Sequence, residues 1–442
     1  NMQSNLSIII LAAGKGTRMK SSIPKVLHKM SGKEMLFYSI EEAKKLSNDI
    51  HVVLYHQAGL VQRSMEKYFN DVNYHIQDHE KYPGTGGAVM GIVPKNEKVL
   101  VLNGDMPLIE AEELTQLTKN DDSHQAKDLK LTMSVLNLAC ADGYGRVVIE
   151  KEKVTKIIEQ KDCSSYELDI VTANAGIYCF DTKFLLESLP KLSNDNAQKE
   201  FYITDLVEIA VKEELTIKPV VVKEENFKGV NSKYDLANAE VIHQNRIKTN
   251  FLKAGITMKL PDTIFIEHDV TIEGESVLEN GVTLLGNSKI CNSIIKTNSI
   301  VEDSIVESSD IGPMARLRPL SILKDTHIGN FVEVKKSKLT GVKAGHLAYL
   351  GDSCIDEGTN VGAGTITCNY DGVNKHKTII GKNVFIGSDT QLVAPVTLED
   401  NTMIAAGSTI TNDVKSGDLA ISRTKQKSLS GFFYKFFKQI KK

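Results

Sequence analysis

The stretch at residues 378–410, TIIGKNVFIGSDTQLVAPVTLEDNTMIAAGSTI, carries an aliphatic residue at every sixth position. These positions are Ile380, Ile386, Leu392, Leu398, Ile404 and Ile410, and an earlier series with the same spacing is Ile266, Ile272, Leu278, Leu284 and Ile290. Most residues two positions before them are Val, Ile, Thr or Ser. A period of six is neither the 3.6 of an α-helix nor the 2 of a single strand. It is typical of a hexapeptide β-helix, in which each side of a triangular coil points one aliphatic side chain inward.

The repeat region also predicts where functional residues lie. About 160 residues at three sides of six make roughly nine coils, a rod of about 40 Å at ~4.8 Å per strand layer. The six-residue register fails in LTGVKAGHLAYLGDSC, residues 339–354, and in TCNYDGVNKHKT, residues 367–378. We expect loops to leave the coil at both places, and loops on a rigid scaffold are common sites of catalysis and binding.

Residues 7–230 have a different pattern, in which short apolar runs alternate with longer charged segments. The runs SIIILA (7–12), IHVVLYH (50–56), KVLVLNGD (98–105) and LKLTMSVLNL (129–138) predict buried strands, and residues 32–46 and 111–119 predict helices. Such an alternation indicates a mainly parallel sheet covered on both faces, with ligands bound at the carboxyl ends of the strands. We therefore expect an α/β domain at residues 2–229, a helical linker at 230–250, and a β-helix domain with a C-terminal tail at 251–442.

The segment LAAGKGTRM, residues 11–19, follows the first predicted strand and suggests a phosphate site. It lacks the GxxxxGK pattern of a P-loop, and Met19 stands where the dinucleotide fingerprint needs a third glycine. The backbone amides of Gly14 and Gly16 can approach an anion, with Arg18 and Lys25 as cationic partners. A glycine turn with basic surface residues is the alternative.

Four further polar or glycine-rich segments can be compared with this one: two carry a side-chain oxygen, and two are glycine-rich loops. Asp105, in NGDMP, is a hard oxygen ligand suited to magnesium, although an Asp after a strand is often only a turn or cap residue. Asn231, in KGVNS, offers a neutral oxygen. PGTGGA (83–88) and GYGR (143–146) add backbone loops that can approach a ligand.

The composition of the chain limits the kinds of molecule that it is expected to bind. The chain has 53 Lys+Arg and 56 Asp+Glu in 442 residues, a net charge of −3, which disfavours a nucleic-acid partner. The 6 cysteines are scattered without CxxC spacing, which predicts reduced thiols and a cytoplasmic protein. No apolar run approaches the ~20 residues of a transmembrane segment. Small-molecule substrates are therefore expected.

The ordered motifs LAAGKGTRM, GTGGA, NGDMP, GYGR, IEQKD, NAGIY, FYITD and GVNS resemble those of sugar-nucleotide pyrophosphorylases. ARLRP, GNFVEVKK, KAGHLAYLGD, GAGTITCNYDG and VFIGSDTQLVAPV follow, and the whole chain resembles the bacterial bifunctional N-acetylglucosamine-1-phosphate uridyltransferase / glucosamine-1-phosphate N-acetyltransferase family. The resemblance implies a left-handed β-helix, a homotrimer, and magnesium with acetyl-CoA as co-substrate. It also implies the reaction order: N-acetylation of glucosamine-1-phosphate, then uridylyl transfer from UTP to N-acetylglucosamine-1-phosphate, yielding a cell-wall precursor and pyrophosphate.

For the first half, the resemblance implies catalytic roles for Arg18 and Lys25 at the phosphates and a magnesium site at Asp105 and Asn231. The residues implied to bind UTP or the nucleotide sugar are Leu11, Ala12, Gly14, Gly16, Lys25, Gln77, Gly84, Thr85, Gly143, Glu159, Asn174 and Asn231. Asn103 stands where the family commonly has Tyr, and Gly87 where it commonly has His. The resemblance therefore does not predict which contacts Asn103 and Gly87 make.

For the second half, the resemblance implies that His346 is the general base, since its ordinary pKa suits proton transfer near neutral pH, and that Glu333 orients its ring. Taken alone, such a histidine is more often a structural hydrogen-bonding group. The implied glucosamine-1-phosphate ligands are Arg318, Lys335, Tyr349, Asn360 and Lys375. The implied acetyl-CoA ligands are Ala363, Asn369, Tyr370, Ser388, Ala406 and Arg423.

Two other function classes fit parts of this pattern. In a monofunctional nucleotidyltransferase the β-helix would only oligomerise, and in a purely structural hexapeptide protein neither half would be catalytic. His346 with its basic neighbours disfavours the first, and Asp105, Arg18 and the glycine loops disfavour the second.

The terminal segment GFFYKFFKQIKK, residues 431–442, has no acidic residue. We expect it to be an arm on a neighbouring subunit or a frayed end, with contact to a membrane surface as the open alternative.

Overall fold

The computed structural model describes residues 5–119 and 129–440, which form two compact units, Asn1–His243 and Gln244–Lys442. The boundary between the units falls within α7 (Lys233–Lys253), which overlaps the helical linker expected at 230–250. Within the described residues, no helix combines the length and hydropathy needed to cross a membrane. The domain limits at residues 229 and 250 stay a prediction.

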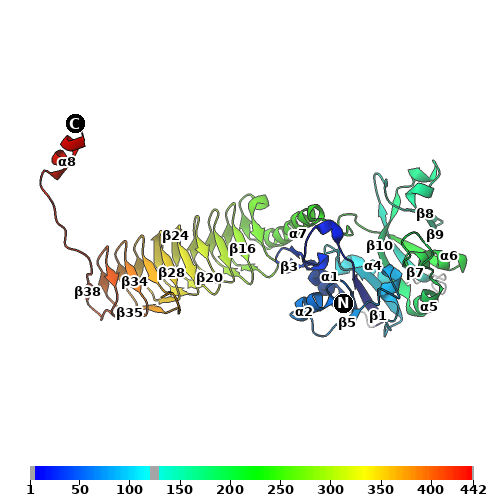
Figure 1. Ribbon diagram of the computed structural model, residues 1–442, viewed down its shortest axis with the longest axis horizontal. Helices are drawn as coiled ribbons and strands as arrows, with labels where there is room; N and C mark the ends of the chain where they lie inside the picture. The colour runs from blue at the N-terminus through cyan, green and yellow to red at the C-terminus, as the bar shows by residue number, and fades with distance from the viewer. Residues whose placement is uncertain (1–4, 120–128, 441–442) are drawn as a thin grey trace. The chain divides into compact units, whose positions relative to one another are not determined.

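The first unit contains a mainly parallel sheet, as the apolar runs predicted (Figure 1). Its strand order is β11-β7-β10-β6-β1-β4-β5. The bounds are β1 Leu6–Ala12, β4 Asp49–Leu54, β5 Asn73–Ile76, β6 Lys98–Asn103, β7 Leu129–Asn137, β10 Thr172–Asp181 and β11 Thr216–Val221. β10 runs antiparallel to both neighbours, and the hairpin of β8 (Arg146–Glu150) and β9 (Lys153–Ile158) extends from it. A small hairpin joins β2 (Lys29–Met30) to β3 (Lys33–Glu34).

Helices cover both faces of this sheet, which explains its continuous apolar strands. The helices are α1 Met35–Lys44, α2 Ala58–Glu66, α3 Gly84–Val89, α4 Ala111–Thr118, α5 Thr182–Ser188 and α6 Asp205–Lys212. Short 3₁₀ turns are η1 Thr17–Met19, η2 Lys25–Leu27, η4 Gln160–Asp162, η5 Glu167–Asp169 and η6 Leu189–Lys191. In β1, Ile8 and Ile10 belong to one buried cluster and Ile9 to another, so both faces of the strand pack against apolar side chains.

A buried polar chain lies at the amino-terminal edge of β1, β4 and β5. The Ser7 hydroxyl donates to Asp49 at 2.6 Å, and Asp49 lies 2.9 Å from His51 Nε2. His51 Nδ1 in turn lies 2.8 Å from His75 Nε2. Burial, together with the neighbouring His51, lowers the pKa of His75. Burial opposes ionisation of Asp49, but the Ser7 hydroxyl, the Lys95 amide and His51 outweigh it and lower the pKa of Asp49.

Acidification is expected to destabilise the first unit through His75. A histidine with a lowered pKa binds its proton more readily in the unfolded chain, so stability falls as pH drops below the ordinary value of about 6.5. Asp49 adds a loss in the same direction only below about pH 4. Urea unfolding of the His75→Gln variant between pH 7.5 and 5 is expected to show a flatter stability profile than the parent. His56, which lies outside this polar chain, should leave the profile unchanged when it is replaced in the same way. Equal slopes for both variants and the parent would show that His75 is not the cause.

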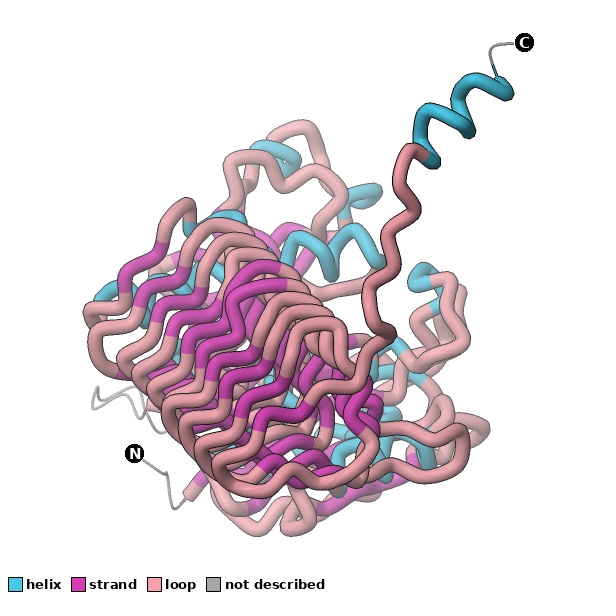
Figure 2. Tube along the Cα trace, turned by 90° about the vertical axis from the view of Figure 1, so that its left-hand side faces the viewer, coloured by secondary structure: helices cyan, strands magenta, loops and turns pink. Residues whose placement is uncertain are grey.

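The second unit is a β-helix of stacked triangular coils, as predicted (Figure 2). The first side consists of β12 Thr257–Met258, β15 Val277–Leu278, β18 Ile294–Ile295, β21 Asp310–Ile311, β24 His327–Asn330, β27 Lys343–His346, β30 Asn360–Val361, β33 Phe385–Ile386, β36 Met403–Ile404 and β38 Leu419–Ala420. The second side consists of β13 Phe265–Ile266, β16 Thr283–Leu285, β19 Ile300–Glu302, β22 Arg316–Leu317, β25 Glu333–Lys335, β28 Tyr349–Gly351, β31 Ile366–Cys368, β34 Gln391–Val393 and β37 Thr409–Ile410. The third side consists of β14 Thr271–Glu273, β17 Lys289–Cys291, β20 Ile305–Glu307, β23 Ile322–Lys324, β26 Lys338–Thr340, β29 Ser353–Ile355, β32 Thr378–Ile380 and β35 Val396–Leu398. The aliphatic residues of both six-residue series are buried in the core of these coils.

The coils are not all of equal length, and this corrects one expectation. Ile386 pairs with Ile404, a full coil of 18, whereas Ile311 pairs with Ile328 and Ile328 with Ala344 after shorter coils. The prediction of a loop at residues 339–354 is wrong, because that segment forms β26 to β29 within coils of 16 or 17 residues, in which some sides are one residue shorter. The loop predicted at 367–378 is confirmed: Val361 pairs with Ile386, and a bridge between Tyr370 and Lys375 closes the excursion.

Helix α7 closes the first coil of the second unit. The Gln244 amide exchanges two hydrogen bonds with the backbone of Ile266, at 2.7 and 2.9 Å. Lys248 Nζ donates to the carbonyls of Pro261 and Ile264 at 2.6 and 3.0 Å, next to the short turn η7 (Pro261–Thr263). The buried end of the coil is thereby paired rather than left open. The last described element is helix α8 (Phe432–Ile440).

Candidate active sites

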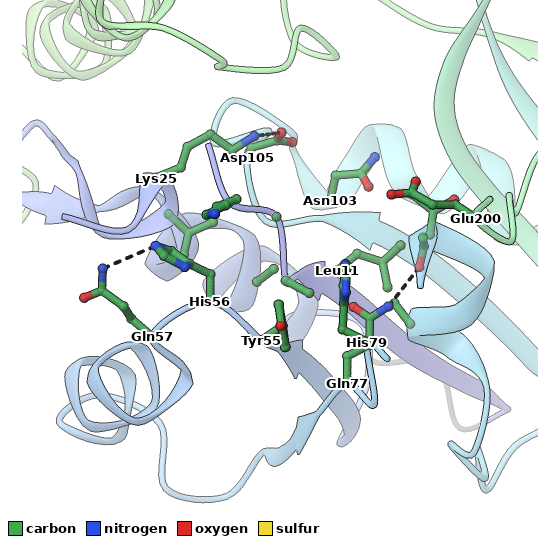
Figure 3. A pocket seen from close by; sticks show the side chains of 18 residues that line it. Leu11, Lys25, Tyr55, His56, Gln57, Gln77, His79, Asn103, Asp105 and Glu200 are labelled. Atoms are coloured by element: carbon green, nitrogen blue, oxygen red, sulfur yellow. Dashed lines mark hydrogen bonds and ion pairs between the residues drawn. The ribbon is translucent and has the colours of Figure 1, made fainter. Parts of the chain in front are cut away.

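A pocket of about 870 Å³ lies in the first unit at the carboxyl ends of β1, β4 and β6 (Figure 3). Its lining contains these residues predicted from the sequence: Leu11, Ala12, Gly14, Lys25, Gln77, Gly84, Thr85 and Asp105. Gly16, Arg18, Gly143, Glu159, Asn174 and Asn231 are not among the lining residues. The pocket is at the sheet edge where parallel α/β folds bind ligands.

Three predicted residues meet at one point beside this pocket. Lys25 Nζ lies 2.8 Å from Asp105 Oδ2 and 3.2 Å from Asn231 Oδ1, although 206 residues separate Lys25 from Asn231. The Val230 amide donates to the Asp105 carbonyl at 2.8 Å and so holds the GVNS segment against NGDMP. Lys25 and Asp105 are both largely buried. A carboxylate and an amide oxygen thus converge on a single cation.

This arrangement fits a magnesium ion. Two protein oxygens of the kind that magnesium prefers point at one cationic position, and the six-coordinate ion would keep room for phosphate oxygens and water. Among the described residues, no group of three or more His, Cys, Asp or Glu forms a metal cluster, so a site with a full set of charged protein ligands is not present there. The donor set suits a metal that is shared with a phosphate ligand.

The glycine turn after β1 sets the direction of Lys25. Gly16 has φ = 64°, in the left-handed region, and a Cβ there would lie 2.6 Å from Lys25 Cβ. Any side chain at this position would displace the lysine from Asp105. Arg18 lies on the neighbouring turn η1 and is exposed to solvent.

Gln77 presents one acceptor to the pocket. Its amide nitrogen donates to the carbonyls of Tyr82 and Gly84 at 2.8 and 3.1 Å, which uses both of its hydrogens. Within the part of the chain that the structure describes, no group donates to its Oε1. The buried side chain therefore offers an oxygen acceptor to a ligand that carries an N–H.

The departure from the family pattern at Gly87 has a steric cause. A Cβ at this position would lie 2.1 Å from the Tyr82 carbonyl oxygen, the same oxygen that accepts from Gln77. The chain path through Tyr82 therefore excludes every larger residue at position 87.

Substitution of Gly87 by Ala is expected to impair nucleotide binding. The methyl group must push the Tyr82 carbonyl away, which releases Gln77, and overpacking of this kind costs typically about 1–3 kcal/mol. We expect the KM for UTP to rise by about tenfold, the factor that corresponds to ~1.4 kcal/mol. Steady-state kinetics measures this. Gly59→Ala, on α2, is the matched control and should leave the KM for UTP unchanged; an unchanged KM in the Gly87 variant would contradict the packing argument.

The predicted sugar-contacting residues lie on the loops and hairpin next to β10. The Gly143 amide donates to Gln160 Oε1, and Asn174 is paired with Tyr178 and with the Gly176 amide. Asn103, which replaces the common Tyr, lines the pocket and donates to the Gly176 carbonyl at 3.1 Å. Asn103 thus links the end of β6 to β10.

Arg146 of GYGR is fully buried and organises these loops. Its guanidinium donates to the carbonyls of Tyr144, Leu168 and Ile170 and to Gln160 Oε1, at 2.7 to 3.2 Å. A buried guanidinium needs such complete pairing, because unpaired donors are costly. Arg146 therefore has a structural role, because it holds the loops at Tyr144, Gln160 and residues 168–170 together. The GYGR motif alone did not predict this role.

The sequence-based prediction missed several pocket residues, namely Ala13, Lys15, Val26, Tyr55, His56, Gln57, His79, Ala88 and Glu200. The rings of Tyr55 and His79 stack with centroids 4.5 Å apart and planes at 12°. Tyr55, His56 and Gln57 directly follow β4, so the strand-end rule that identified LAAGKGTRM also applies to them. Glu200 directly precedes the FYITD motif.

In the second unit, a cluster of cations forms on the second side of the coil. Arg318 lies 3.8 Å from Glu333, and Lys335 Nζ lies 3.4 Å from Asp352. Contact with the Lys335 ammonium lowers the pKa of Lys375, and the charge of Arg318 contributes in the same direction. Three positive groups from two coils and the 367–378 loop thus face one another, as a phosphate site requires.

Two of the predicted neutral residues complete this cluster. Asn369 Nδ2 donates to Asp352 at 2.7 Å and to the Tyr349 hydroxyl at 3.3 Å. Tyr370 is exposed on the loop, and Asn360 lies on the first side, next to Lys343 and Phe385.

His346 lies at the end of β27 and is exposed. Among the residues that the structure describes, none hydrogen-bonds its ring, and Glu333 faces Arg318. In the single chain, Glu333 therefore makes no hydrogen bond to the described ring of His346, and its predicted orienting role stays a prediction.

Four of the six residues predicted to bind acetyl-CoA form one column along a corner of the coil, namely Ala363, Ser388, Ala406 and Arg423, whereas Asn369 and Tyr370 lie at the cation cluster and on the 367–378 loop. The Asp389 amide bonds to the Ala363 carbonyl and the Gly407 amide to the Ser388 carbonyl, both at 2.8 Å. The Arg423 guanidinium donates to the Ala406 carbonyl at 2.7 Å. His346 occupies the equivalent corner position one coil before Ala363, since β27 pairs with β30. The column offers an extended ligand a path along successive coils that ends at His346.

Comparisons with known proteins cover both units. Residues 8–131 match the MobA-like NTP transferase domain, and residues 377–412 match the bacterial transferase hexapeptide (six repeats). A bifunctional protein GlmU of Aliarcobacter butzleri strain RM4018 is 69% identical, with 99% of each chain covered. Proteins of the same name from Wolinella succinogenes and Sulfurovum sp. strain NBC37-1 are 59% and 56% identical, with at least 98% of each chain covered.

Proposed function

The chain belongs to the family of bifunctional GlmU proteins, and we propose how its own residues carry out the two reactions of that family. The β-helix unit transfers the acetyl group of acetyl-CoA to the amine of glucosamine-1-phosphate. The α/β unit then transfers the uridylyl group of UTP to N-acetylglucosamine-1-phosphate. The observation that carries the first assignment is the convergence of Asp105 and Asn231 on the Lys25 ammonium at the carboxyl edge of the sheet.

In uridylyl transfer, a phosphate oxygen of the sugar phosphate attacks the α-phosphorus of UTP, and the bond to the β-phosphate breaks to release pyrophosphate. No protein nucleophile is needed, so the residues act by positioning and by neutralising charge. The backbone at Leu11–Gly14 holds the nucleotide, and Lys25 and Arg18 compensate the phosphate charge. Asp105 and Asn231 would hold a magnesium ion, whose positive charge would neutralise the phosphate oxygens.

Gln77 gives this site a preference for uracil. Because its amide hydrogens are used by Tyr82 and Gly84, it presents Oε1, an acceptor. Uracil carries an N3–H donor at its pairing edge, whereas cytosine presents an N3 acceptor there. Placing two acceptors face to face leaves both unpaired, which disfavours CTP.

In acetyl transfer, His346 takes a proton from the amine as the amine attacks the thioester carbon, and the carbon–sulfur bond breaks to release CoA. Arg318, Lys335 and Lys375 hold the sugar phosphate on the second side of the coil. The column of Ala363, Ser388, Ala406 and Arg423 holds CoA.

We propose that the acetyltransferase is a homotrimer in which each active site lies between the β-helices of two neighbouring subunits. Met314, Phe331 and Leu347 support this assignment, because they are exposed apolar side chains at one corner of successive coils. The Phe331 amide donates to the Met314 carbonyl, and the pairing of Asn330 with His346 places Leu347 beside Phe331. Such a ridge favours burial against another copy. The free cysteines, typical of a reducing compartment, support a cytoplasmic assignment.

The experiment that tests the function is reconstitution with purified protein. The protein should form UDP-N-acetylglucosamine and pyrophosphate when it is given glucosamine-1-phosphate, acetyl-CoA, UTP and magnesium. Mass spectrometry detects the products. Omission of acetyl-CoA should abolish the product, and N-acetylglucosamine-1-phosphate should restore it. Product formation without acetyl-CoA from glucosamine-1-phosphate would contradict the order of reactions.

A chain that ends after His243 is expected to be a monomer that still performs uridylyl transfer. The cut falls after His243 because Ala239 is buried in the core of the first unit, and a shorter chain would open that core. Light scattering and pyrophosphate release measure the two properties. The full-length chain should be trimeric and lose acetyl transfer on dilution; a monomeric full-length chain with undiminished acetyl transfer would refute the shared site.

A further inference from the structure

Helix α8 has two sharply separated faces. At 3.6 residues per turn, Phe432, Phe433, Phe436, Phe437 and Ile440 fall within an arc of about 140°. Lys435 and Lys438 project from the opposite arc. A helix with this pattern buries its apolar face against something when it is stably folded.

Nothing in the described chain covers this face. Phe433 and Ile440 are 65% and 63% exposed, and the other three side chains of the arc are exposed as well. The rings contact one another along the helix, with Phe433 and Phe437 centroids 4.6 Å apart and those of Phe432 and Phe436 6.1 Å apart. The face is therefore a continuous aromatic ridge rather than a set of isolated rings.

Positive charge surrounds this ridge. Lys425 and Lys427 precede the helix, Lys435 and Lys438 lie on its polar face, and the sequence ends in two further lysines. The last acidic residue of the chain is Asp418. An apolar groove on a protein would bury the aromatic ridge but would not pair with the lysines. The surface of an anionic lipid bilayer offers both partners, because its apolar interior buries the ridge and its negative headgroups attract the lysines around it.

We propose that α8 docks on the surface of an anionic lipid bilayer, with its aromatic face in the interface and its lysines at the headgroups. The helix lies in the plane of the surface, because its nine residues are too few to cross the ~30 Å hydrocarbon core. This activity is separate from catalysis: none of its residues belongs to either active site.

The test is co-sedimentation of the full-length protein with vesicles. Vesicles of phosphatidylglycerol and phosphatidylethanolamine should retain the protein at least about tenfold better than vesicles of phosphatidylcholine, since anionic lipid attracts the lysines. Raising the salt from 0.1 to 1 M should release much of it, because screening shortens the range of the attraction.

Two matched variants separate the ridge from the rest of α8. Phe433→Ser with Phe437→Ser should abolish vesicle binding, whereas Tyr434→Ser, off the ridge, should preserve it; both should keep full acetyl and uridylyl transfer. Binding that is equal for neutral and anionic vesicles, or absent altogether, would overturn the proposal. So would protection of α8 from hydrogen exchange in the lipid-free protein together with a changed oligomer mass in the double variant, since that result assigns the ridge to another copy of the chain.

Discussion

Replacement of Asp105 by Asn is expected to reduce uridylyl transfer by about 10²-fold or more, the scale seen when one preorganised electrostatic group is removed. The side chain keeps its size but loses its charge, so the oxygen pair formed with Asn231 becomes neutral and binds a cation weakly. Acetyl transfer should stay at the level of the parent, since the residue belongs to the other unit. Pyrophosphate release and CoA release, measured on the same preparation, report the two reactions.

The ion pair with Lys25 complicates this variant, because the substitution also frees the lysine. Two readouts separate the effects. A lost metal ligand raises the magnesium concentration needed for half-maximal rate, whereas Lys25→Met should raise the KM for UTP without changing that magnesium requirement. Asp71→Asn, at an exposed ion pair with Lys44, is the charge-matched control. Near-parental pyrophosphate release from the Asp105 variant would exclude the magnesium assignment.

Replacement of His346 by Ala is expected to reduce acetyl transfer by about 10²- to 10⁴-fold, the usual contribution of a general base. Uridylyl transfer should be unaffected. A general base acts only when it is unprotonated, so the variant should lose the acidic limb that such a base gives to the pH profile of kcat/KM. CoA release across pH 5.5 to 9 measures both effects.

His327 supplies a matched control, because β24 neighbours β27 and carries the histidine on the same side of the coil. Its ring is paired with Asp310 at 2.5 Å, a structural contact, so His327→Ala should leave the pH profile intact. If the His346 variant kept both the rate and the acidic limb, another group would be taking the proton.

Much of the fold follows from local patterns. The six-residue spacing predicted the β-helix because an inward aliphatic residue per side is a property of each short strand, independent of distant contacts. The continuous apolar strands predicted the covered parallel sheet for a similar reason: Ile8, Ile9 and Ile10 must all be buried, on both faces. The motifs then supplied the chemical groups.

The short coils could not be predicted from a fixed period. Many corners turn at a residue with positive φ, such as Asp303 in a five-residue step and Phe331 in a six-residue step. The turn absorbs the missing residue, so the inward positions stay stacked while the sequence register is lost. The segment around His346 therefore lacks the period although it belongs to regular coils.

Local patterns in the chain predict which chemical groups are present and which strands and coils carry them, but the path of the folded chain sets which of these groups meet. Lys25, Asp105 and Asn231 converge because three distant segments end at one sheet edge, and His346 aligns with Ala363 because a coil returns the chain to the same corner. The fit of Gly87 against Tyr82 and the clamp formed by Arg146 likewise depend on contacts a few ångströms across. A sequence pattern records the periodicity of burial, whereas such contacts depend on the path of segments far apart in the chain.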